Sequence, residues 1–268
     1  MAHTLYDNFF LSNEVEDQLK SHLDLQQFCT VDDSLEGVAG MKVVINTYRA
    51  TDGTEKLTVG QGNSKSIEVS FTDKEYEIAL AQNRFTYNDE HAMRDPNVVP
   101  VGMKHAGTDM FNTIQADIFA EFNKTGIEVP CTAFDFDAFV DAIAAMELEN
   151  DEDTAIFAFV HPKDKAKLRK AMKDDLKYIE AYARTGYIGT VAGVNLYTKS
   201  NATEGEIIVA TKDAVTIFTK KGVEVEQIGI NNRSETAANV RENNVFSRKY
   251  YTVALTNESK AIRLKLGA

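Results

Sequence analysis

The alternation of apolar and polar residues between positions 40 and 96 predicts a long β-hairpin. Residues 41–48 and 65–71 each alternate apolar with polar side chains, and a period of two is typical of strands. Turn residues stand between them at 52–53 and 60–63, where glycine and asparagine allow the chain to reverse. The pattern therefore predicts two antiparallel strands joined by a long turn.

The tip of this hairpin, residues 52–63, is expected to be small and polar, with nothing that fills an interior. Gly53, Gly60 and Gly62 are expected to provide backbone positions with positive φ. A two-stranded ribbon alone is only marginally stable in water. The hairpin should therefore lie on another surface, and we expect that surface to belong to a second copy of the chain.

The segments that flank the hairpin predict an arm, a third strand and a long helix. Residues 1–39 mix aromatic and acidic side chains and contain one amphipathic stretch at 13–27, which predicts an arm with a short helix. Residues 75–87 alternate again as a third strand. From 97 to 124 apolar residues recur every three or four positions, with Gly126 as a stop. At ~1.5 Å per residue this helix would span ~42 Å, although Pro100, Gly102 and Gly107 count against a straight first third.

The second half of the chain predicts a mixed α/β module. Its apolar patterns suggest an amphipathic helix, a buried strand and a charged helix that begins at a proline, followed by several short strands and a final hairpin. In order, these lie at residues 135–148, 154–160, 162–183, 187–199, 206–210, 215–219, 223–228, 250–255 and 261–266. The overall class is α+β.

Composition and charge exclude several functional classes. With 43% hydrophobic residues in 268, the chain can bury a core, so it is not a disordered protein. The formal net charge of -12 opposes the phosphate backbone, which argues against a general nucleic-acid binder. A negatively charged wall around packaged nucleic acid remains compatible with this sign. Residues 1–10 lack the features of a signal peptide, and no apolar run approaches the ~20 residues that span a bilayer.

No motif of catalysis or metal binding is found. The two cysteines, Cys29 and Cys131, are far apart and are expected to be reduced thiols. The five histidines have no metal-ligand spacing, and the acidic run at 147–153 lacks the pattern of a calcium loop. The glycines at 60–62 and 186–193 are read as turn residues. We therefore expect no catalytic, cofactor or metal site; a soluble α/β enzyme would need a site assembled from distant positions.

The order of the predicted elements resembles the major capsid proteins of tailed bacteriophages, which share the HK97-type coat fold with encapsulin shells. The segments that carry the resemblance are KEYEIALAQNRFTYNDEHAMR at 74–94, TGYIGTVAGVNLYTKS at 185–200 and YYTVALTNESKAIRLKL at 250–266. The resemblance covers nearly the whole chain and rests on architecture, because none of these segments is a catalytic signature.

The resemblance implies four regions. Residues 1–39 would be the N-terminal arm and 40–73 an extended hairpin loop that overlaps a neighbouring subunit. Residues 74–128 and 245–268 would form a peripheral domain with the long spine helix, and 129–244 an axial α/β domain. The candidate assembly residues lie in the hairpin loop: Asp52, Gly53, Lys56, Gly60, Gly62 and Lys65.

The resemblance also implies a function and partners. The chain would be a structural protein, not an enzyme, that self-assembles as pentamers and hexamers into an icosahedral head enclosing double-stranded DNA, with no cofactor and no membrane. A separate scaffolding protein and a portal would be its partners, because fewer than 40 residues precede the hairpin. Assembly would take place in the bacterial cytoplasm. The alternative is an encapsulin-type compartment, which has the same fold but holds a protein cargo.

Overall fold

The computed structural model describes residues 23–148, 154–173, 189–229 and 232–267. The predicted arm helix at 13–27, the acidic run at 147–153 and the far half of the charged helix at 162–183 therefore lie partly or wholly outside the described residues. The elements are η1 (Leu25–Phe28), β1 (Thr30–Asp32), β2 (Lys42–Ala50), β3 (Val69–Glu77), β4 (Ala79–Asn88), α2 (Asp89–Arg94), α3 (Val98–Phe122), β5 (Glu128–Cys131), α4 (Phe136–Ala145), β6 (Ile156–Val160), α5 (Pro162–Ala171), β7 (Thr190–Val191), β8 (Val194–Thr198), β9 (Glu206–Thr211), β10 (Val215–Ile228), α8 (Glu235–Asn239), β11 (Glu242–Leu255), η2 (Glu258–Lys260) and β12 (Ala261–Leu266).

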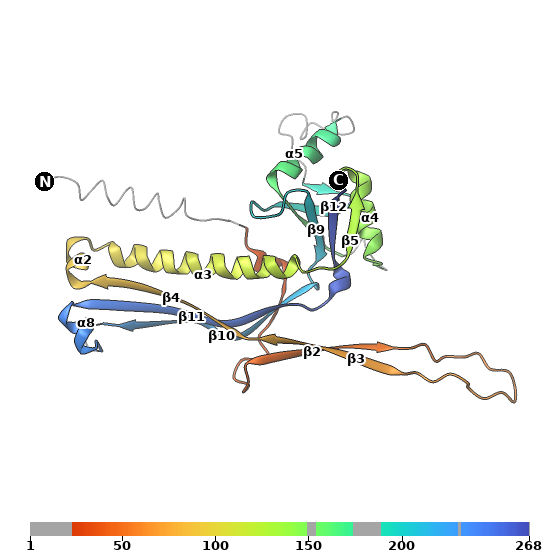
Figure 1. Cartoon of the computed structure of the whole chain (residues 1–268), viewed down its shortest axis with the longest axis horizontal. Coiled ribbons are helices and arrows are strands. Elements are labelled where there is room, and N and C mark those ends of the chain that lie inside the picture. Colours follow the sequence, from red (N-terminus) through yellow and green to blue (C-terminus); the bar gives the residue numbers. More distant parts are fainter. Residues whose placement is uncertain (1–22, 149–153, 174–188, 230–231, 268) are drawn as a thin grey trace.

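Three sheets give the molecule an extended shape (Figure 1). A four-stranded sheet in the order β1-β10-β11-β4 lies along the helix α3, and a six-stranded sheet in the order β5-β12-β9-β6-β8-β7 carries α4 and α5. The antiparallel pair β2-β3 forms the third sheet and projects away from both (Figure 1). Most strand pairs are antiparallel, and the parallel pairs β1-β10, β5-β12 and β6-β8 make two of the sheets mixed.

The long predicted helix is present as α3, although it starts at Val98 and ends at Phe122. Its buried side chains include Met110, Ile114, Ile118 and Phe122, which recur every four residues and face the sheets. Gly102 lies inside the helix. A glycine is needed there because a Cβ would be only 2.2 Å from the ring of Phe85. The glycine therefore serves close packing and does not delay the start of the helix.

The hydrophobic core lies on both faces of the six-stranded sheet. On one face, aromatic rings of β6 pack against the end of α3 and η1; Phe122 and Phe159 are 5.4 Å apart between ring centroids, and Phe28 and Phe157 are 4.8 Å apart. On the other face, buried side chains of α4 and α5 cover the sheet, among them Phe139 and Leu168. The sheet is therefore covered on both sides, which explains why every residue of β6 is buried.

Two predictions about strands near the C-terminus differ from the structure. Residues 215–219 and 223–228 belong to one strand, β10, whose register shifts between Thr219 and Glu224 mark an irregularity and not a turn. The predicted final hairpin is wrong: β11 pairs with β10 and β4, whereas β12 pairs with β9 and β5 in the other sheet. The reason is burial, because Ile262 and Leu264 are inserted in the core of the six-stranded sheet.

The third predicted strand, 75–87, is divided in the structure. Its first residues extend β3 of the hairpin, and β4 begins at Ala79. Ile78 separates them, because its side chain is buried with Val43 and Phe218 while its N–H donates to the carbonyl of Met41 at 2.9 Å. Two strands cross the predicted regions. β10, in the predicted axial region 129–244, belongs to the four-stranded sheet, and β12, in the predicted peripheral region 245–268, belongs to the six-stranded sheet. The limits of the four regions stay a prediction.

Candidate assembly surface

The base of the hairpin is fixed to the four-stranded sheet. Val43 and Ile78, which are 8% and 7% exposed, share a small apolar cluster with Phe218 of β10. The hydroxyl of Tyr76 donates to the carbonyl of Leu255 at 3.3 Å. These contacts bury one face of the hairpin over its first residues only, so they orient the hairpin without covering it.

Beyond the base, one face of the hairpin exposes apolar side chains, with Asp73 and Glu75 among them on the same face. Alternate residues of a strand point to the same face of the sheet. In the antiparallel register, Val44 of β2 therefore shares a face with Val69 and Phe71 of β3. The exposed fractions of these three side chains are 50%, 63% and 64%. Large exposed apolar surfaces are uncommon on monomers and mark sites of association. This face, defined by Val44, Val69 and Phe71, is called the arm face below.

The predicted tip, residues 52–63, lies within a longer loop, residues 51–68, which joins β2 to β3 and is the tip from here on; its own hydrogen bonds hold it. Thr51 N–H donates to Glu68 O at 3.0 Å, which closes the loop beyond the strands. Both the backbone N–H and the hydroxyl of Ser64 donate to the carboxylate of Glu55, at 2.8 and 2.7 Å. These hydrogen bonds hold the pKa of Glu55 below its ordinary value because they stabilise the charged form. The tip is therefore an ordered loop and not a bare turn.

The structure brings the six candidate assembly residues into this one loop but corrects two details. Only Gly60 has a positive φ, of 91°, among the three tip glycines. Gly53 is required for a different reason, because a Cβ would lie 2.6 Å from Cγ1 of Ile67. Asp52, Lys56, Gly62 and Lys65 are exposed. Their contact with a neighbouring subunit stays a prediction.

The expectation of a polar tip is wrong. Leu57 and Val59 lie in it, and their exposed fractions are 48% and 108%. Ile67, just before β3, is 62% exposed. The tip thus continues the apolar character of the arm face, which the alternation pattern alone did not reveal because these residues lie outside the strands.

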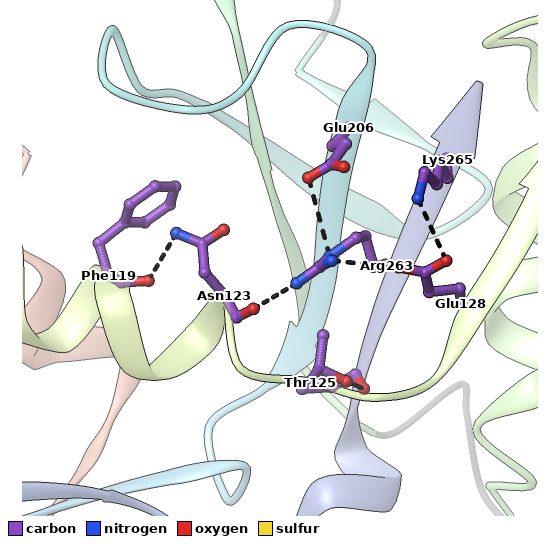
Figure 2. A network of polar contacts seen from close by, with 8 residues as sticks. Phe119, Asn123, Thr125, Glu128, Glu206, Arg263 and Lys265 are labelled. Atoms are coloured by element: carbon purple, nitrogen blue, oxygen red, sulfur yellow. Dashed lines mark hydrogen bonds and ion pairs between the residues drawn. The ribbon is translucent and has the colours of Figure 1, made fainter. Parts of the chain in front are cut away.

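A polar network joins α3 to the six-stranded sheet (Figure 2). Arg263 of β12 lies at its centre. Its guanidinium donates to the carbonyl of Asn123, the C-cap residue of α3. It also forms ion pairs with Glu128 at 3.1 Å and Glu206 at 3.8 Å. The Thr125 hydroxyl donates to the carbonyl of Ala261. One side chain therefore connects the helix end with β5, β9 and β12. Sequence reasoning missed it because its partners are 57 to 140 positions away.

A second polar network closes the far end of the four-stranded sheet. Asp89, at the start of α2, accepts hydrogen bonds from Arg233 at 2.5 Å and Asn243 at 2.7 Å. Next to it, Glu90 pairs with Arg241. The pKa of Asp89 lies below its ordinary value of 3.8, first because Arg233 and then because Asn243 donates to its charged form. This network fixes α2 and the segment that follows β10 at one corner.

No group of three or more His, Cys, Asp or Glu side chains in the described part of the chain could hold a metal ion. Cys29 is buried, which raises its thiol pKa to about 12, and Cys131 is partly buried; both are free thiols. His161 caps α5 by accepting from Lys163 N–H. Among the described residues, no helix is both long enough and apolar enough to span a membrane.

Comparison with known proteins identifies the fold. No protein-family model matches the chain, and no curated protein matches it. Among solved structures, the capsid of the cyanophage P-SCSP1u matches 92% of this chain and 88% of its own, with a TM-score of 0.69 and 16% identity. The capsid of a native GTA particle matches 91% and 90%, with a TM-score of 0.69 and 13% identity. The holo-SrpI encapsulin of Synechococcus elongatus matches 90% and 86%, with a TM-score of 0.63 and 12% identity.

These similarities extend over nearly the whole chain, at sequence identities that establish the fold alone. The α+β architecture with a projecting hairpin, a long helix against one sheet and a second α/β module is the HK97-type coat fold. The predicted fold class is therefore confirmed.

Proposed function

We propose that this chain, which has the HK97-type coat fold, is the major capsid protein of a tailed bacteriophage. It assembles as pentamers and hexamers into an icosahedral head that encloses double-stranded DNA. The observation that carries the proposal is the hairpin, which is anchored at its base, exposes the apolar side chains of the arm face and exposes Leu57 and Val59 in its tip. The match to phage and GTA capsids over nine-tenths of the chain supports the same reading.

The physical properties of the chain suit a shell. An arm that covers apolar surface on a neighbour adds one modest contact per subunit, and repeated contacts in a closed lattice reinforce one another. The net charge of -12 keeps dispersed subunits apart and prevents the wall from gripping DNA everywhere. Within this proposal the regions 1–39, 40–73, 74–128 with 245–268, and 129–244 act as arm, hairpin loop, peripheral domain and axial domain.

The proposed role is structural, not enzymatic, and it defines the partners. The chain binds copies of itself through the hairpin loop, including Asp52, Lys56 and Lys65. It works with a separate scaffolding protein and a portal, and it encloses DNA without sequence-specific contacts. The proposed location is the virion capsid, assembled in the cytoplasm of the bacterial host.

A second candidate is an encapsulin-type compartment, because the encapsulin of Synechococcus elongatus has a similar fold, with a TM-score of 0.63. The two functions differ in what the particle contains. A phage head holds nuclease-protected DNA after packaging, whereas the alternative holds a protein cargo.

The test is to express the chain and measure the mass of the purified protein by light scattering after size exclusion. Particles of megadalton mass, or pentamers and hexamers, support a shell subunit. A monomer at every concentration, with and without its scaffolding partner, contradicts it. Nuclease treatment followed by analysis of the particle contents, from cells that carry the complete source genome, then separates phage head from cargo compartment.

A further inference from the structure

Helix α4 presents an apolar hollow on the surface of the six-stranded-sheet module. Phe136 and Val140, one helical turn apart, are 50% and 43% exposed. With Ile143, Glu147 and Ala192 they line a hollow of about 430 Å³. An exposed phenylalanine and valine over such a hollow indicate a docking surface.

This surface is acidic. Residues 135–148 contain four acidic residues, namely Asp135, Asp137, Asp141 and Glu147, and no Lys, Arg or His. Asp137, Asp141 and Glu147 are exposed. Within the described residues, their side chains take part in none of the ion pairs or hydrogen bonds of the chain. We call this surface the α4 face; it consists of Phe136, Val140, Asp137, Asp141 and Glu147. It would bind a partner that offers positively charged groups and aliphatic surface.

Helix α5 supplies that chemistry. Residues 162–173 contain six Lys or Arg and one Asp, in a chain whose net charge is -12. Lys163, Lys167 and Lys170 follow one another at spacings of four and three residues, so they share the exposed face of α5, opposite the buried Leu168. Lys173 is also exposed and follows two residues after the end of the helix at Ala171. Lys163 and Lys167 already pair with Glu204 at 2.7 and 3.7 Å. Lys170 and Lys173 belong to no ion pair of the described residues.

These two faces do not satisfy each other within one chain. Both helices pack on the same side of the six-stranded sheet, through side chains such as Phe139 and Leu168. They nevertheless lie at different sides of the module, with α5 at the top and α4 at the right in Figure 1. None of the ion pairs of the described residues joins them. Each face is thus left to a second molecule.

We propose that the α4 face of one copy receives the lysine face of α5, the set Lys163, Lys167, Lys170 and Lys173, from the adjacent copy. This inference rests on the proposed function. Two different surfaces that meet head to tail make a heterologous contact, which closes into a ring when the rotation between copies allows it. The contact therefore specifies how axial modules join within a pentamer or hexamer.

The chemistry of the contact follows from the two side-chain types. Lysine carries a long aliphatic stem, which can cover an apolar surface while the ammonium group stays at its rim. Stems of the α5 lysines would cover Phe136 and Val140, and their ammonium groups would meet Asp137, Asp141 and Glu147. Opposite charges at such a rim favour the correct partner and speed association more than they add affinity.

The test is a charge exchange between the two faces. Asp141→Lys with Glu147→Lys reverses the α4 face away from the helix N-terminus, where added cations would oppose the helix dipole. Lys170→Glu with Lys173→Glu reverses the α5 face. Each reversal alone should lower the apparent assembly constant about tenfold or more, measured by sedimentation velocity, because like charges then meet. The chain that carries all four changes should assemble again, to within about threefold of the unchanged protein.

A matched control for the α4 variant carries Asp109→Lys and Asp213→Lys, two exposed acidic residues outside both faces. It changes the net charge by the same amount as the α4 variant and should assemble normally. Circular dichroism confirms that each variant is folded. If folded single-face variants fail and the fourfold variant fails too, the pairing of α4 with α5 is wrong. Loss of DNA content alone in the α5 variant would assign that helix to nucleic acid and also overturn the pairing. If the unchanged protein never assembles, the proposed function fails with it.

Discussion

Gly53 and Gly62 stand in the same loop but meet different steric constraints. A Cβ at Gly53 would lie 2.6 Å from Cγ1 and 2.8 Å from the backbone nitrogen of Ile67, whereas nothing lies within 4 Å of a Cβ at Gly62. Neither has a positive φ. Gly53 therefore sets the shape of the tip, and Gly62 does not.

Gly53→Ala should distort the tip and reduce assembly, while the melting temperature of the unassembled chain changes little because the tip lies outside the core clusters. Gly62→Ala is the control and should assemble normally. Light scattering reports assembly, and differential scanning calorimetry reports stability. Equal assembly by the two variants would show that the shape of the tip is irrelevant.

Arg263 is the residue on which the junction between α3 and the six-stranded sheet depends. Three different nitrogen atoms of its planar guanidinium donate to the carbonyl of Asn123 and pair with the carboxylates of Glu128 and Glu206. A lysine, with one nitrogen, cannot reproduce this arrangement. Lys265 pairs with the same Glu128 at 3.4 Å but is half exposed and has no further partner among the described ion pairs. The two basic residues of β12 thus differ in importance.

Arg263→Ala should lower the free energy of unfolding by about 1–3 kcal/mol, because it removes the donor to a helix-end carbonyl and the partly buried cation that pairs with Glu128 and Glu206. Lys265→Ala should cost less than about 0.5 kcal/mol, as expected for an exposed pair. Urea denaturation followed by circular dichroism measures both. Similar losses for the two variants would contradict the central role of Arg263.

At the scale of elements, the hairpin is stabilised at its base and stabilises little else. Near its start the side chains of Val43 and Ile78 are buried, and the long loop 51–68 makes hydrogen bonds mainly within itself. Because β2 and β3 pair as far as Ala50 and Val69, the strands are aligned without the tip. The tip is free to serve contacts with other copies.

Replacing residues 51–68 by Asn-Gly should leave the subunit folded, because a two-residue turn of this kind matches the twist of antiparallel strands. Assembly should fail, since each subunit loses a contact and even ~1 kcal/mol per contact is multiplied over the lattice. Thermal melting tests the fold and electron microscopy the shells. Normal shells from the shortened chain would identify the tip as an ordinary surface loop.

The corner that joins α2 to the four-stranded sheet should respond to pH. The folded-state pKa of Asp89 is depressed below 3.8, so its contribution to stability is present above that value and is lost as the pH falls through the lower, folded pKa. The pKa of Glu90 is also lowered, first because its own backbone N–H donates to the carboxylate and then because Arg241 does.

The expected result is that wild type and Asp89→Asn differ most in melting temperature at neutral pH, begin to converge below about pH 4 and converge fully only below the folded pKa of Asp89. The exposed Asp33, which has no basic partner among the described ion pairs, provides the control substitution Asp33→Asn. A difference that stays constant from pH 7 to pH 3 would mean that the corner is held by neutral contacts and not by the charge of Asp89.

The sequence was sufficient to predict elements whose apolar residues repeat within one segment. The period of three and four from Met110 to Phe122 predicted α3, and the period of two predicted the strands of the hairpin. Partners far along the chain could not be predicted in this way. Ile262 and Leu264 alternate as any strand does, and only the space beside β9 decides that they join the six-stranded sheet. The tip was misjudged because its exposed Leu57 and Val59 follow no period.

For the molecule as a whole, the fold and the arm face suggest the same conclusion. The chain spreads three sheets along an extended shape, with an arm that one molecule does not cover (Figure 1). The fold is that of capsid proteins from a cyanophage and a GTA particle. We therefore expect copies of this chain to cover one another's exposed apolar side chains in a closed shell.

Electron microscopy of the particles formed by the purified chain, with its scaffolding partner added where the chain alone does not assemble, distinguishes a shell subunit from a protein that stays dispersed. We expect closed shells of uniform diameter, built from five-fold and six-fold rings, with the hairpin of each subunit lying on its neighbour. A preparation that contains only monomers or small open oligomers under both conditions would show that the chain does not form a shell.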